Sequence, residues 1–90
     1  MHFVYVLWSA RIQKRYVGSS DNVHERLRQH NSGGSRFTSR GIPWQLVHVE
    51  EYETKTEARK RENVLKSGIG RKWLDQQYPE YRRGAGVAFS

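Results

Sequence analysis

The sequence contains no cysteine, so it has no disulfide framework and no thiolate for catalysis or for zinc binding. It also lacks a long apolar run. The apolar stretch 3–8 is too short for a membrane span or a signal-peptide core, and no basic segment precedes it. The sequence also lacks internal repeats, a phosphate-binding P-loop, a Ser-His-Asp order and a paired-histidine metal motif. We therefore expect a cytoplasmic protein with no membrane segment.

Acidic residues are scarce. Nine Asp and Glu stand against 16 Lys and Arg, which gives a net charge of +7 and a pI near 10.1. A charge balance of this kind makes nucleic acid the leading candidate partner, although membrane surfaces and other polyanions attract basic proteins as well.

The 90 residues are enough for one small domain, and 36% hydrophobic content with three Trp, five Tyr and three Phe can supply its core. Residues 3–8 are apolar at nearly every position, which is typical of a strand buried on both faces. The pattern as a whole predicts an α+β domain over residues 1–78 and a C-terminal tail over 79–90. The expected elements are strands at 3–8, from 16 to 18, and at 44–52, and helices at 22–30, 54–67 and 70–78.

The stretch Tyr16–His30 combines a strand, a glycine turn and the start of a helix. Asp21 or Asn22 can cap this helix, because Glu25 follows Asn22 by three residues in a near capping-box arrangement. Val23, Leu27 and His30 recur at helical spacing, and Arg26 falls on the same stripe. The Arg26 guanidinium and the His30 imidazole are therefore expected to face the protein interior and not the solvent.

Two more features bear on function. Strands containing Tyr5 and Tyr16 can pair antiparallel with the two tyrosines opposed, which would place both phenols on one face. On residue type alone, the reading of both as ordinary sheet aromatics is the favoured one. In the helix capped by Thr54 and Glu57, Glu62 falls on the buried stripe marked by Ala58, Leu65 and Ile69. A buried carboxylate needs an arginine or a metal ion, so Glu62 is either a salt-bridged structural residue or a metal ligand.

Residues 31–43 read as a loop of small residues that carries Arg36, Phe37, Thr38 and Arg40. Such a loop can wrap a phosphate backbone, and it can equally be a plain connection. His48, on the third expected strand, is more consistent with a structural than with a catalytic role.

Taken together, these motifs resemble the GIY-YIG nuclease family, from about Phe3 to Leu74. The resemblance is carried by Phe3-Val4-Tyr5, Tyr16-Val17-Gly18, Arg26, His30, Glu62-Asn63 and the loop Gly33-Gly34-Ser35-Arg36-Phe37-Thr38. The first family motif is degenerate here, since Phe3-Val4 replaces Gly-Ile, but its tyrosine is present.

The resemblance implies a three-stranded antiparallel sheet flanked by helices. It casts Tyr5 and Tyr16 as active-site phenols, Arg26 and His30 as the polar pair on the helix, and Glu62 as the ligand of Mg²⁺ or Mn²⁺. Magnesium suits a lone carboxylate, because it prefers oxygen ligands and keeps several waters. Tyr16 would act as the general base and Arg26 would hold the phosphate, whereas the choice of Tyr16 or His30 as first proton acceptor stays open.

The leading hypothesis is thus a monomeric, metal-dependent DNA endonuclease that selects its substrate by structure or strandedness, with single-stranded or branched DNA favoured. Ninety residues leave no room for a separate sequence-reading domain, so a partner protein is a second source of specificity. The alternatives are a catalytically silent nucleic-acid-binding module and a protein-interaction scaffold.

Overall fold

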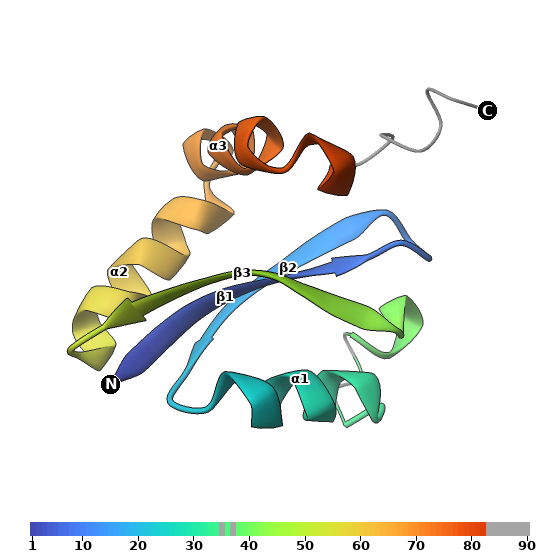
Figure 1. The fold of residues 1–90 in the computed structure, drawn as a ribbon, viewed down its shortest axis with the longest axis horizontal. Coiled ribbons are helices and arrows are strands. Elements are labelled where there is room, and N and C mark those ends of the chain that lie inside the picture. The colour runs from blue at the N-terminus through green and yellow to red at the C-terminus, as the bar shows by residue number, and fades with distance from the viewer. Residues whose placement is uncertain (35, 37, 83–90) are drawn as a thin grey trace.

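The computed structural model describes residues 1–34, 36 and 38–82, and its elements form three layers. A three-stranded antiparallel sheet lies between α1 on one face and α2 with α3 on the other (Figure 1). This architecture confirms the predicted α+β fold. The elements are β1 (His2–Ser9), β2 (Lys14–Ser20), α1 (Val23–Asn31), the 3-10 helix η1 (Ser39–Gly41), β3 (Trp44–Tyr52), α2 (Lys55–Lys66), α3 (Gly68–Gln77) and the 3-10 helix η2 (Pro79–Tyr81).

The strand order is β2-β1-β3, so β1 is central and both its faces are covered. Tyr5 and Leu7 belong to the core cluster on the α1 side, whereas Val4 and Val6 belong to the cluster under α2 and α3. A strand that is buried on both faces has no room for alternating polar residues. The continuous apolar run at 3–8 therefore has a direct structural cause.

The predicted pairing of Tyr5 with Tyr16 is wrong by two residues. Tyr5 stands opposite Gly18, and Tyr16 stands opposite Leu7. Direct pairing would need a two-residue turn at residues 10–11, a position that favours Asn-Gly or a similar pair; the chain instead uses residues 10–13, with Gln13 at φ 56°. A shift of two keeps side chains on their original face, so both phenols still lie on the α1 side.

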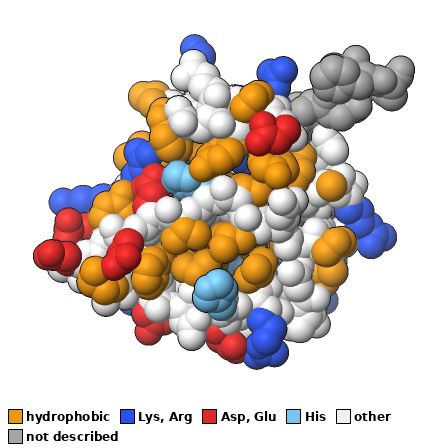
Figure 2. Space-filling model, in the orientation of Figure 1, with side chains coloured by type: hydrophobic (Ala, Val, Ile, Leu, Met, Phe, Trp, Pro, Cys, Tyr) orange, Lys and Arg blue, Asp and Glu red, His pale blue; other side chains and the backbone are white. Residues whose placement is uncertain are grey.

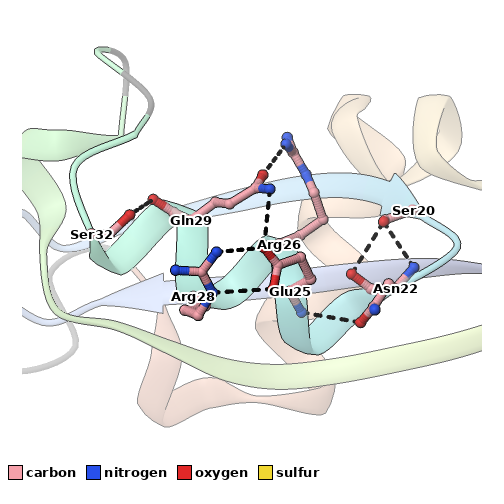
Figure 3. Close-up of polar contacts among 7 residues, drawn as sticks. All are labelled: Ser20, Asn22, Glu25, Arg26, Arg28, Gln29 and Ser32. Atoms are coloured by element: carbon pink, nitrogen blue, oxygen red, sulfur yellow. Dashed lines mark hydrogen bonds and ion pairs between the residues drawn. The ribbon is translucent and has the colours of Figure 1, made fainter.

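Helix α1 begins as the sequence predicts. The backbone N–H of Glu25 donates to Asn22 Oδ1 over 3.1 Å, and the Ser20 hydroxyl in turn accepts from the Asn22 N–H (Figure 3). Val23 and His30 are buried on the inner face. The capped start thus fixes which residues of this helix face the sheet.

The predicted buried stripe of the second helix needs one correction. Ala58 and Leu65 are fully buried in α2, but Ile69 is 79% exposed. The chain leaves the helix at Ser67, whose ψ of 170° is extended, and α3 then starts at Gly68 along a new axis. Helical periodicity counted across this break therefore fails at Ile69.

Past α3 the chain stays attached to the sheet. The Tyr81 hydroxyl accepts a hydrogen bond from Gln45 Nε2 over 3.1 Å, so η2 contacts β3 within the predicted tail. Residues 83–90 lie outside the described part. Within the described residues, each helix is too short or too polar to cross a membrane. The boundary at residue 78 and the cytoplasmic location stay predictions.

Candidate active site at the edge of β2

Four of the five residues predicted to be catalytic meet in one cavity of about 360 Å³ at the free edge of β2. Tyr5 and Tyr16 come from the sheet, Arg26 from α1 and Glu62 from α2. Elements from both sides of the sheet contribute, because an edge strand lets side chains approach around it. The whole lining is Tyr5, Tyr16, Gly18, Ser19, Arg26, Arg59, Glu62 and Asn63.

Gly18 makes this meeting possible. A Cβ atom at this position would lie 2.6 Å from the Tyr5 hydroxyl oxygen and 2.8 Å from Tyr5 Cζ, closer than such atoms approach in proteins. The two phenol rings are 6.3 Å apart between centroids. Glycine is therefore required here by the close approach of a side chain.

Tyr5 lies at the head of a buried hydrogen-bonded chain. Its hydroxyl is 3.2 Å from His30 Nε2, and His30 Nδ1 is 2.9 Å from Thr38 Oγ1. All three residues are at most 1% exposed. His30 does not line the cavity, so it can exchange protons with a molecule there only through a tyrosine.

The burial of Thr38 corrects one prediction. Thr38 was expected to contact nucleic acid, but its side chain is 0% exposed and its hydroxyl is bonded to His30. The main chain of Thr38 also accepts a hydrogen bond from the Trp44 indole over 2.7 Å. This residue holds the imidazole and the loop in place and has no free surface for DNA.

Burial changes the ionisation of this chain of groups. It raises the pKa of Tyr5, and together with the positive charge of Arg26 it lowers the pKa of His30. At neutral pH both groups are therefore uncharged. Tyr5 keeps its proton and is poorly suited to act as a base.

Arg26 points from α1 towards β2, and its Nη1 donates to Gln29 Oε1 over 2.7 Å (Figure 3). The nearby phenol of Tyr5 raises the pKa of the guanidinium, which stays charged. Gln29 Nε2 lies 3.5 Å from Glu25 Oε1, so the guanidinium is braced by its own helix. The charge of Arg26 is thus fixed at the cavity before any anion arrives.

Glu62 presents its carboxylate to β2 across the edge of the sheet. Oε1 accepts from the Ser19 hydroxyl over 2.7 Å, and Oε2 accepts from Lys66 Nζ over 2.6 Å. Burial by itself would raise the pKa of Glu62, but the hydrogen bonds from Lys66 and Ser19 outweigh it and lower the pKa. The carboxylate is ionised at neutral pH.

These features fit a hard divalent cation. The donor is an ionised oxygen ligand with a side chain 17% exposed, and the polar cavity beside it has room for metal-bound waters. Among the described residues no three His, Asp or Glu side chains gather at one point. Glu62 would therefore be a single protein ligand, with water and phosphate completing the coordination.

The sequence alone did not single out Ser19, Arg59 and Asn63 as parts of this cavity. Arg59 lies three residues before Glu62, so helical spacing gave a signal for it. Asn63 directly follows Glu62, a spacing that does not place two residues on one face, and its signal was the family pair Glu62-Asn63. The sequence signal for Ser19 was weaker, because Ser19 can be recognised as a site residue only once Glu62 is known to contact β2.

The predicted nucleic-acid-binding arginines lie in a second cavity of about 890 Å³, which adjoins the first through Tyr16. Arg36 and Arg40 are exposed there, opposite Lys14 and Arg15 of the hairpin. Phe37 lies outside the described residues.

A separate polar cluster ties β3 to α2 away from the cavity. Glu50 accepts from Arg61 Nε at 2.8 Å, from the Tyr52 hydroxyl at 2.6 Å, and pairs with His48 Nε2 at 2.7 Å. His48 Nδ1 is also 2.8 Å from the Tyr78 hydroxyl. These contacts agree with a structural role for His48.

Comparison with known proteins identifies the family. Residues 1–73 match a family described as the GIY-YIG catalytic domain, which is most of the chain. The chain belongs to this family. The GIY-YIG domain is a nuclease domain, so the chemistry of the family concerns phosphodiester bonds.

Similar GIY-YIG relatives are small proteins. A UPF0213 protein of Bacillus licheniformis is 36% identical over 89 residues, which cover 98% of this chain and 89% of the relative. UPF0213 proteins of Natronomonas pharaonis and Staphylococcus aureus are each 39% identical, over 73% and 81% of this chain and 78% and 89% of their own lengths. Their names state no activity. No solved structure matches.

Proposed function

We propose that this GIY-YIG protein is a metal-dependent endonuclease that hydrolyses DNA phosphodiester bonds. The observation that carries the proposal is the convergence of two phenols, a charged guanidinium and an ionised carboxylate on one polar cavity. Phosphodiester hydrolysis needs a base for the attacking water, a cation at the phosphate and stabilisation of the leaving oxygen. The cavity offers a group for each of these tasks.

Tyr16 is the best candidate for the general base. It lines the cavity, whereas His30 is buried behind Tyr5 and the raised pKa of Tyr5 keeps that phenol protonated. In the proposed reaction Tyr16 first gives its own proton towards His30 or solvent, and the phenolate then takes the proton from the attacking water. Tyr5, held by His30, orients the water or the phosphate. Arg26 binds two phosphate oxygens, because its planar fork matches them.

Glu62 would hold Mg²⁺ or Mn²⁺, which when bound supplies positive charge to the phosphate and to the leaving oxygen. Ser19 keeps the carboxylate turned towards the cavity through its 2.7 Å hydrogen bond. Without a metal ion, Lys66 balances the negative charge of the Glu62 carboxylate by donating to its Oε2 atom. Lys66 must give up this hydrogen bond if a metal ion binds at Oε2.

We also propose that the substrate is DNA, selected by shape or strandedness, with single-stranded or branched forms favoured. Arg36 and Arg40, across a cavity from Lys14 and Arg15, offer cations for the phosphate backbone beside Tyr16. We propose a monomer that acts alone or with a partner protein that directs it to its sites.

The test is Glu62→Gln, which removes the anionic ligand at nearly constant volume. We expect loss of cleavage of single-stranded, nicked, flap and junction DNA in Mg²⁺, DNA affinity within about threefold of the parent, and loss of Mn²⁺ binding measured by electron paramagnetic resonance. The control is Glu51→Gln, an exposed carboxylate on β3. A Glu62→Gln protein that cuts at the parent rate would contradict the proposal.

A further inference from the structure

A third cavity, of about 490 Å³, lies on the α2 and α3 side of the β1–β2 hairpin. Its floor is mainly apolar and is formed by Trp8, Val17, Leu65 and Leu74, which come from four different elements. Cavities of this size accept flat heterocycles and small ligands. The floor by itself would suit any apolar group.

The rim of this cavity is basic. Lys14, Arg15, Lys66 and Arg71 surround the apolar floor. Arg15 is held by an ion pair with Asp75, whereas Lys14 and Arg71 are exposed. An apolar floor ringed by cations complements a ligand that joins an aromatic ring to an anion. A nucleotide has this composition.

The third cavity adjoins the candidate active site. Tyr16 lines both cavities, and Lys66 on the rim of one is hydrogen bonded to Glu62 in the other. This arrangement offers the third cavity to a nucleotide next to a scissile phosphate at Arg26 and Glu62.

Gln13 provides a second, independent observation. It lines the same cavity, and its Oε1 is shielded from solvent without a hydrogen-bond partner among the described residues. The amide nitrogen of Gln13 donates to the Ala10 carbonyl over 3.2 Å. Buried acceptors without a partner are rare. A nucleobase carries N–H donors that can satisfy this oxygen once the Gln13 amide turns towards the cavity.

We propose that this cavity binds one unstacked base of the substrate strand, next to the scissile phosphate. The proposal rests on the proposed nuclease function and names its substrate class: DNA that is single-stranded at the cleavage point. A base in duplex DNA is stacked and paired, so it can enter only after it has been turned out of the helix. Trp8 is only 4% exposed and its ring lies 6.1 Å from that of Tyr81, so the base would lie over the floor in apolar contact with it. Apolar contact reads no base edge, which would make the site tolerant of sequence.

The experiment follows the backbone and Trp8 indole resonances of the full chain by NMR, without metal, so that no hydrolysis occurs. The probes are dAMP, dCMP, dGMP and dTMP, with deoxyribose 5-phosphate as the base-free comparison. We expect the nucleotides to shift resonances of Trp8, Val17 and Leu65, and to bind about tenfold more tightly than the base-free sugar phosphate.

A pair of neighbouring cations supplies the matched variants. Arg71→Ala removes a rim charge and should weaken dAMP binding at least about threefold, whereas Lys72→Ala, exposed on α3 and outside the cavity, should leave it unchanged. Equal binding of dAMP and deoxyribose 5-phosphate would overturn the proposal. So would shifts confined to the residues around Arg26 or around Arg40.

Cleavage is assayed separately in Mg²⁺, so the two proposals can fail independently. Base-dependent binding at Trp8 in a protein that cuts no DNA would overturn the nuclease function alone. Cleavage of fully duplex DNA at the same rate as single-stranded DNA, with no base-dependent shifts, would overturn the base site alone.

Discussion

At the scale of single residues, Tyr5 and Tyr16 have different surroundings although both belong to the cavity. Tyr5 is 1% exposed and bonded to His30, whereas Tyr16 is partly exposed and lines all three cavities along the β2 edge. A base must reach the water that it deprotonates. The geometry therefore favours Tyr16 for proton transfer and Tyr5 for orientation.

Replacing Tyr16 by Phe should lower the single-turnover cleavage rate by ~10²–10⁴-fold, because the ring and its packing remain and only the proton acceptor is lost. Thermal melting should change by the equivalent of about 1 kcal/mol or less. The control is Tyr52→Phe, which also loses a hydroxyl, but one bonded to Glu50 in the separate polar cluster. Equal cleavage rates for the two variants would refute the assignment of Tyr16.

A single added methyl group should disrupt the cavity at Gly18. In Gly18→Ala the new Cβ would lie 2.6 Å from the Tyr5 hydroxyl, so the phenol must move away from its position beside His30. We expect a loss of about 1–3 kcal/mol in the free energy of unfolding and at least a tenfold loss in cleavage rate.

The control for this variant is Gly68→Ala, because the nearest side-chain atom to its new Cβ is 4.0 Å away, in the guanidinium of Arg71. Denaturant unfolding and single-turnover cleavage measure both effects. A Gly18→Ala protein with the stability and rate of the parent would show that Tyr5 has more freedom than its contacts indicate.

At the scale of elements, the position of α2 decides where Glu62 points. Arg61, the residue before Glu62, is paired with Glu50 of β3 through Nε at 2.8 Å and Nη2 at 3.2 Å. The guanidinium also lies 5.0 Å from the centroid of the Trp73 ring in α3. This bidentate pair fixes the rotation of α2 about its axis, and the neighbouring carboxylate then faces Ser19.

The Glu50 cluster predicts how stability depends on pH. Burial alone would raise the pKa of Glu50, but hydrogen bonds from Arg61, Tyr52 and His48 outweigh it and lower the pKa from 4.5 to about 2. A depressed carboxyl pKa gives stability that is present above pH 4.5 and is lost as the pH falls towards 2. Its upper bound is about 3 kcal/mol.

Denaturant unfolding at pH 6, 4 and 3 measures this contribution. Glu50→Gln should be clearly less stable than the parent at pH 6, and the difference between the two should shrink as the pH falls. Glu51→Gln, the exposed neighbour, serves as the control and should follow the parent. A constant difference between Glu50→Gln and the parent at all three pH values would contradict the role of the ionised carboxylate.

At the scale of the whole molecule, the positive charge is distributed unevenly. On the face in Figure 2, hydrophobic side chains gather across the middle, and Lys and Arg lie towards the margins. By contrast, Lys14, Arg15, Arg36 and Arg40 share one cavity, and Arg26 and Arg59 share the adjoining one. We therefore expect DNA to follow the β2 edge.

Binding along that edge should weaken steeply with salt, because each neutralised phosphate contributes about −0.9 to the log-log slope for duplex DNA and about −0.7 for single strands. The double variant Arg36→Ala with Arg40→Ala should lower affinity and flatten the slope, and it should leave the cleavage rate of bound DNA unchanged. The control pair is Lys55→Ala with Lys60→Ala, exposed on α2 and outside the three cavities. Equal slopes for both double variants would move the DNA path elsewhere.

Much of this protein follows from local sequence. The apolar run at 3–8, the Asn22 and Thr54 caps and the third strand at 44–52 all depend on neighbours within a few residues, and the structure has each of them where the pattern predicts it. The family resemblance is likewise confirmed by the match over residues 1–73. The catalytic roles of Tyr5, Tyr16, Arg26, His30 and Glu62 stay predictions.

Tertiary structure alone decided the contacts between residues distant in the chain. The hairpin register depends on a turn with no strong sequence signature, and the bond from Ser19 to Glu62 spans 43 positions. Thr38 sits in a loop of small polar residues, and only the packing of α1 against that loop places its hydroxyl on His30. A sequence pattern predicts which face of its own helix or strand a residue occupies. The burial of that residue and its hydrogen-bond partners depend on how the elements pack, because packing brings together residues that lie far apart in the sequence.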